Sequence, residues 1–164
     1  GCGSQLRRLL FRSGGVRGRA GVYQSNSHHA ILDALFNTKA TEAIQKGIDI
    51  DFELNDLSAP PFDVSDMVVL FSNLLDNAIE ACEKINSNRV IRVSAVLKQS
   101  FLFSIRNTTL PVEIKNDTIK TTKPNAHLHG FGLSNIKLIL NKYHADFVMD
   151  YEDGWFQFTG EIEA

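Results

Sequence analysis

The sequence predicts an α+β fold, a two-layer α/β sandwich with helices on one face of a mixed, mostly antiparallel sheet. Residues 48–54 alternate apolar and acidic side chains, which is the period of a half-buried strand. Residues 27–46 and 64–84 repeat apolar residues at helical spacing. Residues 146–151 and 155–162 flank a Glu-Asp-Gly turn and predict a closing hairpin. This order of elements suits helices packed on one face of a sheet.

Composition is that of a soluble globular domain. At 164 residues the chain fits one domain with a sizeable core, and its net charge of -2 gives no general attraction to nucleic acid. No apolar run approaches the ~20 residues that span a bilayer. Cys2 and Cys82 form neither a disulfide framework nor a metal motif, and Cys82 is expected to be a small buried hydrophobe.

The first part of the chain differs from the rest, because residues 1–24 hold five arginines and no acidic residue. We interpret residues 1–26 as a flexible basic segment and partly a remnant of expression; the alternative is an arm that binds nucleic acid or anionic lipid. Residues 27–46 are expected to form a linking helix whose apolar seam either packs on the domain or pairs with a second copy. Residues 47–164 form the main domain.

Five elements are expected between the first strand and the closing hairpin. Residues 64–84 form the central helix, with Asp63 or Ser65 as its cap. Two strands follow at 89–97 and 101–106. Residues 107–128 contain few large apolar side chains and are too long for a routine connection, which favours a functional lid. A helix is then expected from Gly132 to about Lys142.

Two carboxamides stand out in the central helix. Asn73 and Asn77 are four residues apart and therefore share one helix face. Asparagine is unfavourable inside a helix and costly to bury without a partner. The partner is either a hard cation such as Mg²⁺, which prefers oxygen ligands, or a neighbouring loop that hydrogen-bonds both amides.

A glycine-bearing stretch precedes the last predicted helix. His129, Gly130 and Gly132 are expected to form a loop that runs directly into this helix, whose Leu133 and Ile136 lie on one side. Glycines let the backbone approach a ligand closely, and free amides at a helix start attract phosphate. The alternative is a packing or capping device.

Together the two stretches resemble a known nucleotide-binding domain. Residues 73–78 are similar to the N box, and residues 130–133 to the second glycine box, of the domain shared by gyrase, heat-shock chaperone ATPases, sensor histidine kinases and mismatch-repair ATPases. Residues 77–81 and 129–133 resemble the peptide-sensing histidine kinases of the quorum-sensing type. The resemblance covers roughly residues 28–162.

The resemblance implies ATP and Mg²⁺ as cofactors, with residues 107–128 as a mobile lid over the nucleotide cleft. It makes Asn77 the first candidate for a metal ligand and Asn73 the second, and it places Gly130, Gly132 and Leu133 at the phosphates. In the hydrolysing relatives a glutamate that activates water occupies the position of Asn73. Because an amide does not accept a proton usefully near neutrality, this difference favours a kinase over a hydrolase.

The sequence also departs from the family pattern. Residues 107–111 lack the adenine-recognising aspartate and both glycines of the family motif, and Leu128 stands where a further glycine is expected. Asn107 either accepts a hydrogen bond from the adenine amino group or only closes the strand end. His129 either donates to a phosphate oxygen or faces solvent. Lys123 in the lid is a candidate partner of the γ-phosphate.

The resemblance therefore implies the catalytic ATP-binding domain of a two-component sensor histidine kinase. Such a domain donates the γ-phosphate to a histidine on a dimerisation helix, and a response regulator is the further partner. His28 and His29 are expected on the exposed side of the linking helix rather than as acceptors, since His29 is followed by Ala30 and not by an acidic residue. The parent would be a homodimeric, membrane-anchored receptor with this domain in the cytoplasm. Two alternatives are an interaction module that uses nucleotide poorly and an anti-sigma-type serine kinase.

Overall fold

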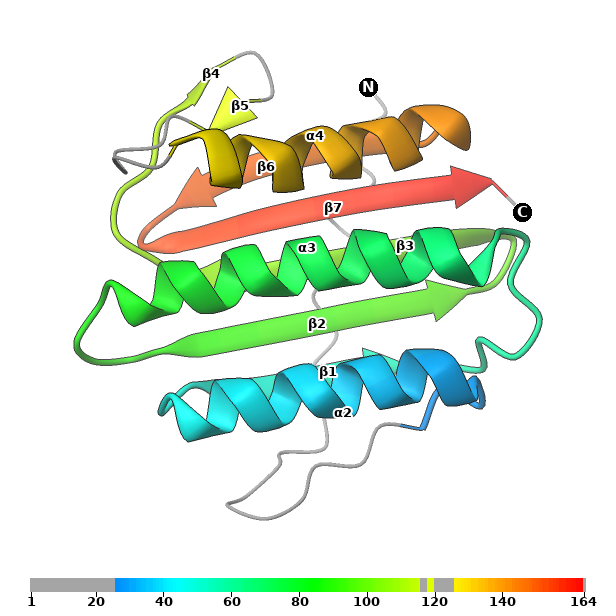
Figure 1. The fold of residues 1–164 in the computed structure, drawn as a ribbon, viewed down its shortest axis with the longest axis horizontal. Helices are drawn as coiled ribbons and strands as arrows, with labels where there is room; N and C mark the ends of the chain where they lie inside the picture. The colour runs from blue at the N-terminus through cyan, green and yellow to red at the C-terminus, as the bar shows by residue number, and fades with distance from the viewer. Residues whose placement is uncertain (1–25, 116–117, 120–125, 164) are drawn as a thin grey trace.

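The computed structural model describes residues 26–115, 118–119 and 126–163 and confirms the two-layer sandwich (Figure 1). Five strands form one sheet in the order β1-β2-β3-β7-β6, and only β1 and β2 are parallel. A short hairpin, β4-β5, stands apart from this sheet. The elements in chain order are α2 (Ala30–Gln45), β1 (Asp49–Leu54), α3 (Val64–Glu83), β2 (Val90–Leu97), β3 (Ser100–Thr108), β4 (Ile114–Lys115), β5 (Thr118–Ile119), α4 (Ala126–Lys142), β6 (Asp146–Glu152) and β7 (Trp155–Glu163).

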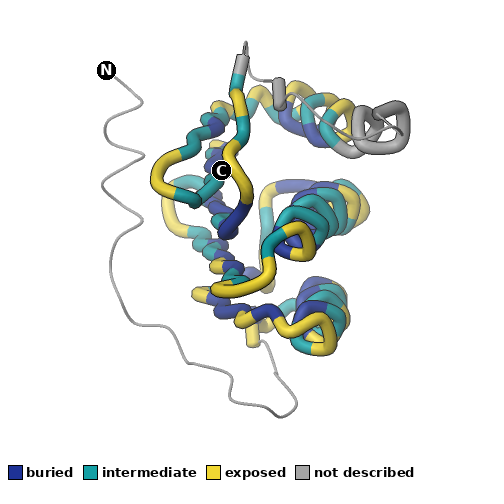
Figure 2. Tube along the Cα trace, turned by 90° about the vertical axis from the view of Figure 1, so that its left-hand side faces the viewer, coloured by how far each residue is buried: buried dark blue, intermediate teal, exposed yellow. Residues whose placement is uncertain are grey.

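The three helices cover one face of the sheet, with α3 between α2 and α4 (Figures 1 and 2). In β1, Ile50 and Phe52 are buried under the helices. The acidic residues point to the opposite face, where Asp49 and Glu53 are exposed and Asp51 is buried beside Arg92. This alternation orients the sheet, because successive strand residues point to opposite faces. The parallel pairing of β1 with β2 follows from the α3 crossover that joins them.

Aromatic side chains fill the space between the two layers. Phe71 of α3 meets Phe36 of α2 and the neighbouring rings of β3, Phe101 and Phe103, at centroid distances of 5.3 to 6.2 Å. Phe103 in turn stacks on Phe158 of β7. This continuous aromatic core fixes α3 over the middle of the sheet.

Helix α2 belongs to the same helix layer. Its seam residues Leu32, Phe36, Ala40 and Ala43 are fully buried, and the helix packs on α3 and β1. Of the two expected uses of the seam, packing on the domain is therefore the one observed, and pairing with a second copy stays a prediction. Ile31, next to the buried Leu32, is 55% exposed.

Two histidines precede α2 rather than lying on its exposed side as expected. His29 is the N-cap, and its Nδ1 accepts a hydrogen bond from the Leu32 backbone N–H at 3.4 Å. His28 has a φ of 60° in the left-handed region. A capping role accounts for His29 without any acceptor chemistry.

Two further boundaries, both near the predicted site, differ from the sequence prediction. Strand β3 continues to Thr108, so Asn107 lies inside the strand, paired with Phe156 of β7. Helix α4 begins at Ala126, so Gly130 and Gly132 lie within a helix and not in a loop before it. The expected lid also contains the β4-β5 hairpin, while Lys123 lies outside the described residues.

No helix in the described ranges is both long enough and apolar enough to cross a membrane.

Candidate functional site

The central feature of the site is the pair of asparagines on α3. Asn73 and Asn77 are partly exposed, above the buried Leu74 and Ala78. Across the part of the chain that the structure describes, neither carboxamide makes a side-chain hydrogen bond, so the expected alternative of a loop partner is not observed there. Both side-chain oxygens can therefore accept a bond from a ligand.

The asparagine face of α3 is turned toward α4. Asp66 lies seven residues before Asn73 and therefore on the same stripe of the helix. The Asp66 carboxylate accepts hydrogen bonds from Lys142 Nζ at 2.7 Å and from the Tyr143 hydroxyl, at the C-terminal end of α4. Because the start of α3 meets the end of α4 and the helices lie side by side, they run antiparallel (Figure 1).

The same alignment sets the level of the glycine stretch along α3. Asn77 lies eleven residues after Asp66, and Phe131 lies eleven residues before Lys142. Equal steps along two antiparallel helices bring the α4 backbone around Gly130 and Gly132 to the level of Asn77. Leu133 is partly buried and packs on the core, and the side chain of His129 lies outside the described part of the structure.

Asn107 lies beside the C-terminal end of α3. It is 2% exposed, and its Nδ2 donates to the Thr108 carbonyl at 3.1 Å. Cys82, the fifth residue after Asn77, contacts that carbonyl through its thiol at 3.4 Å. Within the described ranges no donor reaches the Asn107 side-chain oxygen, so the expected role as adenine acceptor remains a prediction. The alternative, that Asn107 only closes the strand, does not fit, because β3 ends at Thr108.

Cys82 behaves as the sequence predicts. It is fully buried, and burial raises the pKa of its thiol above the ordinary value of 9.0, against a smaller lowering by its bond to Thr108. It therefore contributes packing and a weak hydrogen bond beneath Asn107.

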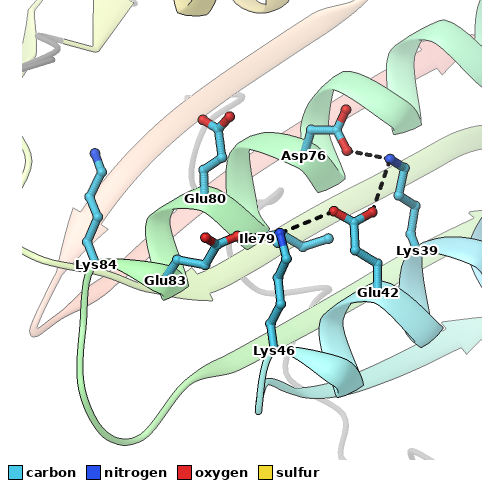
Figure 3. Close-up of a pocket in the computed structure, with 8 residues that line it drawn as sticks. All are labelled: Lys39, Glu42, Lys46, Asp76, Ile79, Glu80, Glu83 and Lys84. Carbon is cyan, nitrogen blue, oxygen red and sulfur yellow. Dashed lines mark hydrogen bonds and ion pairs between the residues drawn. The ribbon is translucent and has the colours of Figure 1, made fainter. Parts of the chain in front are cut away.

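The other flank of α3 borders a charged groove of about 750 Å³, which no pattern in the sequence predicts (Figure 3). Lys39 of α2 pairs with Asp76 of α3 and with Glu42, and Lys46 pairs with Glu42 and Glu83. Burial lowers the pKa of Lys39, but its two carboxylate partners outweigh burial and leave that pKa above 10.5. Because Lys39 and Lys46 already form ion pairs with carboxylates, this groove is a poor site for phosphates.

The donor set of the asparagine face suits a cation that arrives with a ligand. No group of three or more histidine, cysteine, aspartate or glutamate side chains in the described residues could hold a metal alone. Asn73 and Asn77 instead offer neutral oxygens. Mg²⁺ commonly takes few protein oxygens and keeps waters and substrate phosphates as its other ligands.

Comparisons with known proteins identify the family and the fold. A family model described as GHKL domain matches residues 62–163. The catalytic domain of the histidine kinase ThkA in a nucleotide-free form has a TM-score of 0.65 at 18% identity, over 84% of this chain and 92% of that chain.

Two further solved structures have the same fold. The Acinetobacter baumannii histidine kinase AdeS has a TM-score of 0.62 at 16% identity, over 98% of this chain and 72% of that chain. The mycobacterial sensor histidine kinase MprB has 0.57 at 12%, over 80% and 95%. No protein with a curated description matches the chain by sequence.

Proposed function

The chain belongs to the GHKL domain family, and on that premise we propose that it binds MgATP between α3 and α4 as the catalytic domain of a sensor histidine kinase. The γ-phosphate of the bound ATP is transferred to a histidine on a dimerisation helix. The observation that carries this proposal is the asparagine pair without side-chain partners in the described residues, on the α3 face turned toward α4.

Each residue of the site has a defined part in this proposal. Asn77, and secondarily Asn73, would hold Mg²⁺ through their side-chain oxygens. The bound Mg²⁺ supplies positive charge to the phosphates. The α4 backbone near Gly130 and Gly132 is the candidate phosphate contact, together with His129, Leu133 and Lys123. Asn107 would accept a hydrogen bond from the adenine amino group.

The chemistry of Asn73 favours transfer over hydrolysis. A carboxamide does not take up a proton at neutral pH, so this position holds no general base for an attacking water. Phosphoryl transfer depends mainly on positioning and on charge stabilisation, and both can be provided without a base in this chain. The γ-phosphate is thereby left for an acceptor that brings its own nucleophile.

The wider setting is also a proposal. The sequence phrases at residues 77–81 and 129–133 support a parent of the peptide quorum-sensing type. Such a parent would be a membrane-anchored homodimer with this domain in the cytoplasm and a response regulator as its downstream partner.

Calorimetric titration with a non-hydrolysable ATP analogue, with and without Mg²⁺, tests the binding. We expect weak binding that depends on Mg²⁺ and that Asn77→Ala weakens at least about tenfold. Asn141→Ala on the exposed side of α4 is the matched control and should bind as the unmutated chain does. Absence of binding by the unmutated chain would reject the proposal.

Phosphotransfer separates the remaining alternatives. Incubation with labelled ATP and a histidine-bearing dimerisation domain should label histidine, which is recognised by its acid-labile phosphate. Binding without transfer would instead support the interaction module, which the departures at residues 107–111 motivate. An acid-stable phosphoserine would support the serine kinase.

A further inference from the structure

At the far end of the α3–α4 interface lies a polar cluster to which the proposed function assigns no role. The Asp66 carboxylate accepts bonds from Lys142 and from the Tyr143 hydroxyl, and Lys142 also lies 3.5 Å from Asp63. The same hydroxyl accepts the Asp63 backbone N–H at 3.0 Å. The ring of Tyr143 packs edge-on against Phe62 at 6.3 Å. The start of α3 and the end of α4 are thus tied by several directional contacts.

We propose that Asp66, Lys142 and Tyr143 form a latch that sets the position of α4 along α3 and so places the backbone near Gly130 and Gly132 opposite Asn77. This inference rests on the proposed function and deepens it. Its members are positioning residues, since they act on the nucleotide through the helices.

Apolar packing alone does not define this position. Ile136 and Leu140 are fully buried in the helix layer, but such contacts are non-directional. A slip of α4 by one residue would move its backbone by about 1.5 Å past Asn77. Because functional groups must be held within about 0.5 Å of their working geometry, a slip of that size would matter.

The geometry of the latch suits this task. Asp66 is one-fifth exposed at its side chain, so its bonds are only partly screened by water. It also lies on the same α3 stripe as Asn73 and Asn77, about 16 Å from Asn77 along the helix axis. The latch therefore anchors α4 on the face that carries the ligand oxygens.

The other flank of α3 supplies a matched control. Lys39 of α2, like Lys142 of α4, binds two carboxylates, and one of them belongs to α3. Lys39→Gln thus removes a comparable charge network from the side of α3 that faces away from α4. A purely structural effect on α3 would appear in Lys39→Gln and in Lys142→Gln alike.

The test measures affinity for a non-hydrolysable ATP analogue with Mg²⁺ at a temperature where circular dichroism shows each variant to be folded. We expect Lys142→Gln and Tyr143→Phe to weaken binding about fivefold or more. We expect Lys142→Arg to restore most of the affinity and Lys39→Gln to change it less than about twofold, within the error of additivity. If Lys142→Gln does not fold, Tyr143→Phe, which removes one oxygen atom, carries the test.

Two results would overturn the latch while leaving the proposed function intact. One is unchanged affinity in folded Lys142→Gln and Tyr143→Phe. The other is equal weakening by Lys39→Gln, which would indicate a general loss of stability. Absence of binding by the unmutated chain is a different pattern, and it would reject the proposed function together with the latch.

Discussion

Replacing Gly160 by alanine tests the packing of the aromatic core. Gly160 of β7 pairs with Phe103 of β3, and the ring of Phe103 lies over the glycine. A Cβ atom at this position would meet Phe103 Cζ at 2.2 Å and Cε1 at 2.5 Å, well inside the 3.4 Å at which ordinary contact begins. The ring would therefore have to move by about 1 Å, which is a large shift in a close-packed interior.

The Phe103 ring has little space into which to move. It is fully buried and stacked against Phe101 and Phe158, with Phe71 edge-on at 5.7 Å. Overpacking of this kind costs about 1–3 kcal/mol, and a contact as short as 2.2 Å places this site in the upper half of that range. Alanine recovers about 0.5–1 kcal/mol because glycine is unfavourable inside a strand. We therefore expect Gly160→Ala to lower the free energy of unfolding by about 1–2 kcal/mol and the melting temperature by about 3–8 °C.

Urea unfolding of a double-mutant cycle separates the steric term. Phe103→Leu shortens the side chain that blocks the added methyl, so Gly160→Ala should be nearly neutral in that background. The coupling free energy between the two sites should then reach about 1 kcal/mol. A neutral or stabilising Gly160→Ala in the unmutated background would refute the reasoning.

Two further predictions concern the end of α4. The bonds from Lys142 and then Tyr143 hold the pKa of Asp66 below its ordinary value of 3.8, so its stabilising contribution is present above that value and is lost as the pH falls through the lower folded pKa. The stability difference between the unmutated chain and Asp66→Asn, measured by urea unfolding, should therefore be widest at neutral pH and shrink in acid; a constant difference would contradict the assignment. His144 has a φ of 51° just after α4, so His144→Gly should raise the free energy of unfolding by about 0.5 kcal/mol, and a loss of stability would argue against strain there.

Periodicity in the sequence was enough to locate most of the fold. The strands at 49–54 and 146–152 and the helix at 64–83 lie within one residue of the predicted bounds, because each has a strong apolar repeat. The predicted start of α4 was wrong. Glycine usually breaks helices, so Gly130 and Gly132 indicated a loop.

Some parts of the candidate site could also be predicted from the sequence, and others could not. Asn73 and Asn77 could be found from the sequence because an amide pair inside a helix contradicts helix propensity. The contacts of Asp66 could not, because Lys142 and Tyr143 follow it by more than seventy residues and only the tertiary fold makes them neighbours. The charged groove beside α2 was missed for the same reason, since Lys39 and Asp76 meet only when the two helices pack.

The two outermost strands of the sheet have a consequence for how copies of the domain behave in a concentrated solution. Asp49 and Glu53 are exposed along β1, and Asp146 and Glu152 are exposed along β6. A second molecule that extended the sheet at either border would bring like charges together at neutral pH. The acidic borders thus act against edge-to-edge aggregation.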